Sequence, residues 1–398
     1  MSRLSTLRAL TAATAAGVLA LAPAVPGSAA PQAPGPSPEP LDAVVTEKLL
    51  DRAGSISAFA DAGPDDARVT ISRSQGDWAF GTAVLVAPRD EADHHPQGWL
   101  FVAHRVDGAW TVAFEGESEF GSISKASPVL SASEREIFAS HDGSVRPQAN
   151  GDYRTGMRLP FATGQSWSMW GGPHGWGGYE TPYSSLDLSG GDQVVRAPRA
   201  GTAYTMCQGW VRVVHDRGYA TDHYHLWDNI WVDGAWVNEG AFLGYTGTDV
   251  TCGGSANGRH VHFALRQNGA YVGIAYHIIG QWVPMNGGSA YGGYALHGSQ
   301  VVYVGGTLYN YGALGLNQGI VDTDGGGVLN KRSGPGTGYP IVGSVADGAV
   351  VTISCSANGT THTGRWGTTS LWNRLSDGSW VSDAYLYTGS NNPINGWC

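Results

Sequence analysis

The sequence predicts a mainly β protein of two or three domains. Glycine accounts for 59 of the 398 residues and charged residues for only 14%, so turns are frequent and long charged helices are scarce. The 15 Trp and 17 Tyr exclude a disordered chain. Short runs of β-branched and aromatic residues recur between glycine-rich turns, as in antiparallel sheets. The length exceeds that of one ordinary domain.

The N-terminus has the pattern of a secretory signal peptide over residues 1–30. Arg3 and Arg8 precede an apolar run, and Ser28-Ala29-Ala30 is a small-residue cleavage pattern. The apolar run is short for a membrane span, and no later stretch is long and apolar enough. We therefore expect a secreted, extracellular protein without membrane insertion.

Residues 31–155 are expected to form a propeptide. A proline-rich segment (31–40) excludes a helix or a central strand, and a helical pattern then covers 41–53. Alternating segments and an acidic helical stretch predict a small α+β module: residues 78–86, 98–103, 109–114 and 131–139.

Charge separates this module from the rest of the chain. Residues 31–155 hold 10 Lys and Arg against 19 Asp and Glu, whereas 156–398 hold 11 against 14. Neither part has a basic stripe, so no nucleic-acid partner is expected. The histidines of the acidic module are expected to be surface or core residues rather than metal ligands: His94, His95, His104 and His141.

Two His-x-His motifs suggest metal chemistry. His260 and His262 lie in a β-rich run, where alternate residues face the same side of a strand. Two imidazoles so spaced can reach one metal ion, or one can bind it while the other acts on what the ion holds. His223 and His225 alternate in the same way, so periodicity does not choose between them.

His174 and Asp187 are thirteen residues apart, and the glycine-rich loop between them can fold back to bring them together. Taken alone, a histidine such as His174 is more often an ordinary loop residue than a metal ligand. Asp187 could cap a helix or form an Asx turn, but its place in a strand-like run makes this the weaker account.

These motifs in this order resemble the M23 zinc metallopeptidases, specifically their β-lytic and staphylolytic branch. The resemblance covers about residues 157–311 and rests on His174 with Asp187, Tyr224-His225-Leu226 and His260-Val261-His262. It implies an antiparallel β-sheet domain with an active-site groove, assigned to residues 156–311. The wide His–Asp spacing departs from the commoner family members and agrees with the β-lytic form.

The resemblance implies roles for individual residues. His174, Asp187 and His262 would bind one Zn²⁺ per chain, and His225 and His260 would be the catalytic histidines. Three protein ligands and one water make an open tetrahedral site, whose charge lowers the pKa of the water from about 16 toward 7. No His-Glu-x-x-His helix supplies a glutamate base, so the two catalytic histidines are left to activate the water and stabilise the oxyanion.

Two neighbouring residues are also assigned. Tyr224 matches a tyrosine that contacts the bound substrate in this branch. His223 matches no ligand of the family and is expected beside the ligands or in the groove.

The four cysteines are expected to form two disulfides, because thiols outside the cell are usually oxidised. Three pairings are possible. Pairing within domains joins Cys207 to Cys252 and Cys355 to Cys398, and each loop would gain roughly 4 kcal/mol. The first pair also resembles the disulfide of the β-lytic branch.

A glycine-rich linker (312–327) leads to a last domain, residues 328–398. Its short, regularly spaced strands predict a small β-barrel. The runs 332–337 and 377–385 resemble bacterial SH3 domains, which bind cell walls or peptides. Four aromatic residues could form a recognition surface, although some must fill the barrel: Trp366, Trp372, Trp380 and Tyr385.

We therefore expect a secreted zinc metalloendopeptidase that hydrolyses peptide or muramoyl-peptide amide bonds of bacterial peptidoglycan. It would be made as a zymogen, carry an SH3-like cell-wall-binding domain and act as a monomer. A glycine-lined, aromatic groove suits glycine bridges and D-alanine cross-links equally. The alternatives are an inactive wall-binding protein and a broad extracellular protease that degrades glycine-rich proteins.

Overall fold

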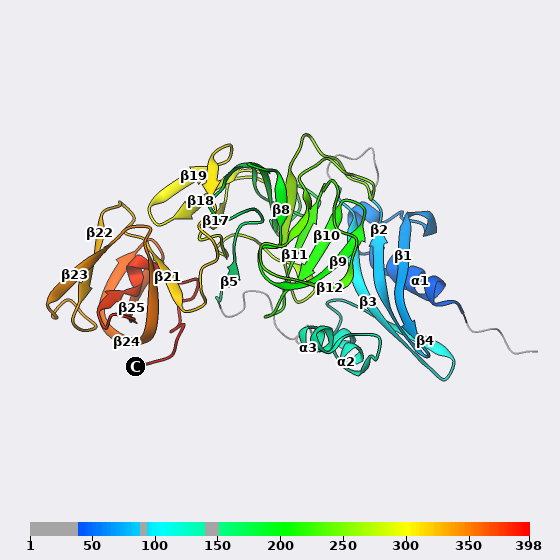
Figure 1. Cartoon of the computed structure of the whole chain (residues 1–398), viewed down its shortest axis with the longest axis horizontal. Helices are drawn as coiled ribbons and strands as arrows, with labels where there is room; N and C mark the ends of the chain where they lie inside the picture. The colour runs from blue at the N-terminus through cyan, green and yellow to red at the C-terminus, as the bar shows by residue number, and fades with distance from the viewer. Residues whose placement is uncertain (1–38, 88–93, 140–150) are drawn as a thin grey trace, which may run out of the picture. The chain divides into compact units, whose positions relative to one another are not determined.

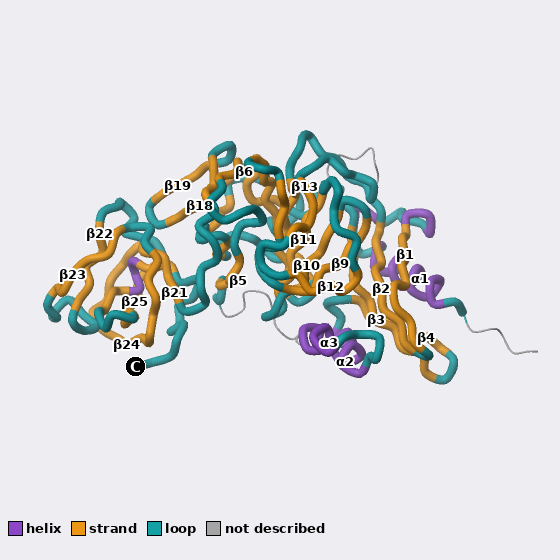
Figure 2. The backbone as a smooth tube through the Cα atoms, in the orientation of Figure 1, coloured by secondary structure: helices purple, strands orange, loops and turns teal. Residues whose placement is uncertain are grey.

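The computed structural model describes residues 39–87, 94–139 and 151–398. The expected signal peptide, residues 31–38 of the proline-rich segment and His141 lie outside the described residues. The described chain is mainly β, as expected (Figures 1 and 2). None of its helices is long and apolar enough to cross a membrane.

The first module is a four-stranded antiparallel sheet in the order β1-β2-β3-β4 with three helices. Leu41, Val45 and Leu49 recur every four residues along α1 and are buried, so this helix packs one face on the sheet. The bounds are α1 Leu41–Ala53, β1 Ala67–Gln75, β2 Trp78–Leu85, β3 Gln97–Val106, β4 Ala109–Phe114, α2 Ser118–Ala126 and α3 Ala132–Ala139.

A nine-stranded sheet forms the middle of the chain. Its strands run in the order β12-β9-β10-β11-β14-β7-β6-β20, with β15 paired to β14, and every pair is antiparallel. The bounds are β6 Ser166–His174, β7 Ser185–Gly190, β9 Gly201–Cys207, β10 Trp210–Val214, β11 Tyr219–Tyr224, β12 Asp233–Val237, β14 Val261–Gln267, β15 Ala270–Tyr271 and β20 Thr307–Tyr309.

Smaller sheets flank this one. β5 pairs in parallel with β16, β8 pairs with β13, and β17, β18 and β19 form a three-stranded meander. The bounds are β5 Arg154–Met157, β8 Val194–Arg196, β13 Phe242–Tyr245, β16 Ile278–Ile279, β17 Val283–Asn286, β18 Gly293–His297 and β19 Gln300–Tyr303.

The two faces of β14 have different surroundings. Val261, Phe263 and Leu265 are fully buried in one hydrophobic core with residues of β6, β7 and β10. Because side chains alternate along a strand, His260 and His262 face the opposite side of the sheet. His260 Nε2 and His262 Nδ1 lie 3.5 and 3.0 Å from the same atom, Asp187 Oδ1, so the expected placement of the two imidazoles on one face is observed.

The first module and the nine-stranded sheet share a second core. Phe80 and Val102 of the module are buried in one cluster with Tyr204 and Trp210 of the sheet. A fully buried ion pair lies beside this cluster, with Arg212 Nη1 at 2.7 Å from Glu115 Oε2. Arg212 also contacts Asp222 at 2.8 Å, so its charge is paired within the interior. Breaking such a pair would leave a buried charge uncompensated.

The last part of the chain forms a seven-stranded sheet in the order β23-β22-β26-β25-β24-β21-β27. β21 lies inside the expected linker and pairs with both β24 and β27. Of the four aromatic residues singled out above, Trp372 is buried and the others are half-buried. The bounds are β21 Gln318–Val321, β22 Val328–Arg332, β23 Ile341–Ala346, β24 Val350–Gly364, β25 Gly367–Leu375, β26 Trp380–Ser382 and β27 Leu386–Tyr387.

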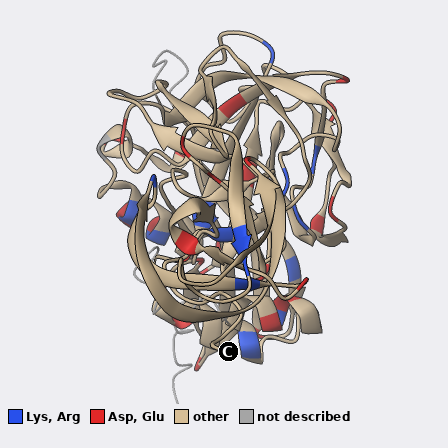
Figure 3. Cartoon of the chain, turned by 90° about the vertical axis from the view of Figure 1, so that its left-hand side faces the viewer, with Lys and Arg blue, Asp and Glu red and all other residues tan. Residues whose placement is uncertain are grey.

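The cysteines pair as expected, Cys207 with Cys252 and Cys355 with Cys398. In the view of Figure 3, basic and acidic residues are interspersed among uncharged ribbon, without a continuous basic run.

The buried His215 predicts how stability depends on pH. Its Nδ1–H donates to Ala200 O at 3.0 Å, and its Nε2 accepts from Thr221 Oγ1 at 3.0 Å. Burial lowers the pKa of His215 to about 3, so the unfolded chain binds more protons between that value and the ordinary pKa near 6.5. Stability should therefore fall as the pH drops from 6.5 toward 3, by up to about 1.4 kcal/mol per pH unit from this residue.

Urea unfolding between pH 4 and 7 with a chelator present would measure this slope. His215→Gln can keep both hydrogen bonds but does not titrate, so its slope should be shallower than that of the unaltered chain. Equal slopes would contradict the prediction.

Candidate functional site

Strand register brings three expected ligand residues together. In the pairing of β14 with β7, His262 lies directly opposite Asp187. β6 pairs with the other edge of β7 and ends at His174, after two shifts of register. Gly171 lies opposite Asp187 on this side, and a Cβ there would come within 2.5 Å of Asp187 Oδ2. Glycine therefore leaves the space that the carboxylate occupies.

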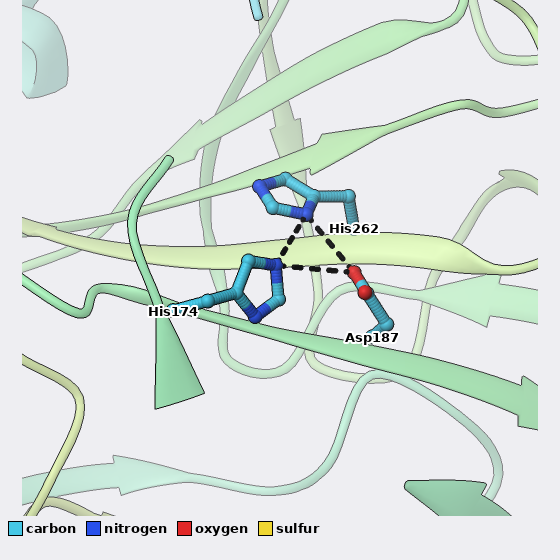
Figure 4. Close-up of side chains that lie close together, drawn as sticks. All are labelled: His174, Asp187 and His262. Atoms are coloured by element: carbon cyan, nitrogen blue, oxygen red, sulfur yellow. Dashed lines mark hydrogen bonds and ion pairs between the residues drawn. The ribbon is translucent and has the colours of Figure 1, made fainter. Parts of the chain in front are cut away.

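The ligand atoms of these residues converge on one point (Figure 4). His174 Nε2 lies 3.2 Å from His262 Nδ1 and 3.5 Å from Asp187 Oδ1, and the last two atoms are 3.0 Å apart. Tetrahedral ligands at about 2.0–2.1 Å from a zinc ion would be roughly 3.3 Å apart. The spacing of these atoms suits such an ion.

Hydrogen bonding identifies the free nitrogen of His174. Its Nδ1 lies 2.7 Å from Gly172 O, and a carbonyl can only accept, so Nδ1 carries the proton. Nε2 of the neutral ring then points its lone pair at the other two ligand atoms. This arrangement, with the second ring nitrogen bonded to a carbonyl, is typical of metal-binding histidines.

The electrostatics of the cluster also favour a cation. Burial lowers the pKa of His262 to about 4. Burial opposes charge on His174 and Asp187 as well, but their mutual attraction raises the pKa of His174 and holds the pKa of Asp187 well below its usual range. In the metal-free chain a proton on His174 can therefore stand in for a positive ion among the three groups.

His225 and His260 border the same cluster, with ring centroids 4.9 Å apart. His260 Nδ1–H donates to Gly258 O at 2.8 Å, and its Nε2 lies 3.5 Å from Asp187 Oδ1. His225 Nδ1–H donates to Asp249 O at 3.0 Å, while its buried Nε2 has no hydrogen-bond partner within the described part of the chain. Burial lowers the pKa of His225 well below its usual value, so its Nε2 carries a free lone pair.

His223 and His225 do not lie on the same face of the sheet, so the prediction from strand alternation is wrong here. β11 ends at Tyr224, and His225 follows with a φ of 68°. This left-handed residue redirects the chain, so alternation no longer applies. The His223 ring packs on Phe263, which points into the core, and does not line the cavity described below.

Tyr224 is buried rather than displayed. Its hydroxyl donates to Gly253 O at 2.7 Å, and its ring stacks on His225 with centroids 4.4 Å apart. Its substrate contact stays a prediction.

A cavity of about 280 Å³ opens over the cluster. Asp187 and His262 of the cluster line it, together with His225 and His260. Its walls also include Trp170, Tyr179 and Tyr291, with Trp170 and Tyr179 half or more exposed. His95 of the first module also lines this cavity and is only 5% exposed. The sequence offered no signal for this residue, because its partners are more than 80 positions away.

Three ligand atoms around one point, two from imidazoles and one from a carboxylate, and two further imidazoles beside them form the donor set of a metal-dependent hydrolase. Among the described residues three protein ligands converge, which leaves a fourth position for water or substrate.

Comparisons with known proteins agree with this chemistry. The chain is 38% identical over 130 residues to protease LasA of Pseudomonas aeruginosa, covering 30% of this chain and 31% of LasA. It is 30% identical over 138 residues to the beta-lytic metalloendopeptidase of Lysobacter enzymogenes, covering 32% of this chain and 75% of that protein. The uncharacterized protein YraJ of Bacillus subtilis is 40% identical over 99 residues, 23% of this chain and 84% of YraJ.

Among solved structures, the M23 metalloprotease pseudoalterin is 31% identical, covers 38% of this chain and 97% of its own, and superposes with a TM-score of 0.37. No protein-family profile matches the chain. The chain spans about a third of LasA but three quarters of the beta-lytic enzyme from Lysobacter. At that coverage and identity, the chain belongs to the M23 family of metallopeptidases.

Proposed function

We propose that this protein is a secreted zinc metalloendopeptidase of the β-lytic and staphylolytic branch, which hydrolyses peptide or muramoyl-peptide amide bonds of peptidoglycan. The convergence of His174 Nε2, Asp187 Oδ1 and His262 Nδ1 carries the proposal. The similarity to a beta-lytic metalloendopeptidase and to LasA supports it.

Zinc held by these three side chains would polarise the scissile carbonyl and acidify a bound water. His225 and His260, which lie beside the three ligand residues, would have different roles in the reaction. His225 Nε2 has a free lone pair and a tautomer fixed by Asp249 O, which suits it to accept a proton. His260 Nε2 faces Asp187 and, when protonated, can stabilise the negative oxygen of the tetrahedral intermediate.

The cavity favours a peptide with small side chains. Trp170 and Tyr179 offer flat apolar surfaces in the cavity wall, against which the backbone of such a peptide can pack. Peptidoglycan peptides, rich in glycine and D-alanine, have this character. The cavity suits both of these residues.

The other parts of the chain would serve the same reaction. We propose residues 1–30 as signal peptide, 31–155 as propeptide, 156–311 as peptidase domain, 312–327 as linker and 328–398 as an SH3-like wall-binding domain. The linker is not wholly separate from that domain, because its strand β21 pairs with β24 and β27. The short antiparallel strands of the last sheet and the resemblance of residues 332–337 and 377–385 support the final assignment. Two disulfides are compatible with an extracellular, monomeric enzyme.

Metal binding gives the first test of the site. Adding Zn²⁺ to the chelated chain should raise its melting temperature with one ion bound, because a ligand at 1,000 times its Kd adds about 4 kcal/mol of stability. Asp187→Asn should lose most of this effect, since one of three ligands loses its charge. The exposed Asp192 lies five residues away, and Asp192→Asn is the matched control.

Calorimetry and metal analysis would measure both variants. One tightly bound zinc in Asp187→Asn would contradict the ligand assignment.

The catalytic histidines should be separable from the ligands. His225→Ala or His260→Ala should retain zinc but lose about 10²- to 10⁴-fold in rate, the usual contribution of a positioned acid or base. His277→Ala, which removes a buried imidazole outside the cavity, controls for loss of a core histidine. Wild-type rates in either catalytic variant would contradict these roles.

Purified cell walls test the substrate class. The full-length chain should reduce the turbidity of walls after limited proteolysis has removed the proposed propeptide, and should lose this activity with a zinc chelator. Mass spectrometry of the fragments would identify the bond. Faster release from a soluble glycine-rich protein would favour a broad protease, and binding to walls without release would favour an inactive binding protein.

A further inference from the structure

A segment of the first module reaches into the cavity over the ligand cluster. His94, His95 and Pro96 immediately precede β3, and His95 lines the cavity together with Asp187, His225 and His262. Of the His95 surface, 5% remains exposed. A residue of the module thus lies where a substrate must approach.

Two reciprocal hydrogen bonds hold this segment. His95 Nδ1–H donates to Trp176 O at 2.6 Å, and Trp176 Nε1–H donates to Pro96 O at 2.6 Å. Trp176 is itself almost fully buried and follows His174 by two residues. These two hydrogen bonds therefore attach the segment to the loop that follows His174.

The imidazole of His95 packs edge-on against two rings of the site. Its centroid lies 4.6 Å from that of His262 at an interplanar angle of 79°, and 5.0 Å from that of His225 at 77°. Non-bonded carbon atoms approach to about 3.5–4.0 Å, so no peptide plane fits between these rings. The scissile bond cannot occupy this space while His95 does.

The opposite wall is fitted closely to the segment. A Cβ on Gly254 would come within 2.6 Å of His95 Cδ2 and 2.8 Å of His94 O. Nearby, Ala87 N–H donates to Cys252 O at 2.9 Å. Farther away, the buried Arg212–Glu115 ion pair joins the module to the nine-stranded sheet. The segment is thus held by backbone, side-chain and core contacts together.

We propose that His95 is an intramolecular plug of the substrate site, which keeps the full-length chain closed until the module is removed or displaced. The ligand atoms that lie close to one another belong to His174, Asp187 and His262. His95 contributes no atom to this group, so it acts by filling space rather than as a fourth ligand. This inference rests on the proposed function, because it assumes that the cavity receives a peptide.

Binding of triglycine hydroxamate to the zinc-loaded full-length chain tests the plug by calorimetry, without any turnover. The apparent Kd equals the intrinsic Kd divided by the fraction of open sites, so a site closed more than about 90% of the time weakens binding at least tenfold. His95→Ala should therefore bind at least about tenfold more tightly than the unaltered chain. Equal affinities would overturn the proposal.

Two variants separate the plug from a loosened module. His95→Phe keeps a ring in the same space and should bind as weakly as the unaltered chain. His104→Ala removes an imidazole that stacks on Trp78 of the same module, outside the cavity, and should also change nothing. If His95→Phe or His104→Ala opened the site as far as His95→Ala, the side chain would not be the plug.

If His95→Ala does not fold, the unaltered chain still provides a test. Diethyl pyrocarbonate acylates accessible imidazoles, so peptide mapping should find His225 modified at least about tenfold more slowly than the partly exposed His104. Equal rates would overturn the proposal.

The two hypotheses fail differently. Tighter hydroxamate binding by His95→Ala, with no wall hydrolysis before or after proteolysis, would refute the proposed function and leave the plug standing. Wall hydrolysis, with equal hydroxamate affinity in both chains, would refute the plug alone.

Discussion

The register of β14 between β7 and β11 is the constraint on which the site depends. It sets His262 opposite Asp187 on one side and opposite Tyr224 on the other. A shift of one residue would turn both imidazoles of the His-x-His pair into the core and bring Val261 and Phe263 to the cavity. The burial of Val261 and Phe263 therefore fixes the position of the ligand residue His262 as firmly as the contacts of His262 itself.

Backbone carbonyls orient the imidazole rings that the strand register brings together. The Nδ1–H groups of His174, His225 and His260 each donate to a backbone carbonyl. These bonds fix the orientation of each ring, and in its neutral form each ring carries its proton on Nδ1 and its lone pair on Nε2. Rotating a ring would leave its buried donor unpaired, which makes the arrangement preorganised.

The first module is both a separate sequence unit and a partner of the nine-stranded sheet. Its excess of acidic residues distinguishes it along the chain, yet its Glu115 is fully buried beside Arg212 and its Phe80 shares a core with Tyr204. Alternate residues of β2 and β3 are buried on both faces of their sheet, one against α1 and the other against the nine-stranded sheet. Domain boundaries read from composition therefore do not show which surfaces pack together.

Features that depend on neighbours along the chain could be predicted from the sequence. The helical pattern over residues 41–53 predicted α1, and period-two alternation placed His260 and His262 on one face. The mainly β class and both cysteine pairings also followed from the sequence. The meeting of His174, Asp187 and His262 was reached through the resemblance to a family, since alternation cannot join separate strands.

The positions of His225 and His95 depend on contacts between distant parts of the chain. The positive φ of His225 breaks the alternation at the end of β11, and its stabilising contact with Asp249 comes from a distant loop. α2 also escaped prediction, because a nine-residue helix containing Gly121 has little local signal and depends on packing. His95 has no periodic or motif signature, since its partners are Trp176, His225 and His262. Local patterns set the face of an element, whereas long-range packing sets which faces meet.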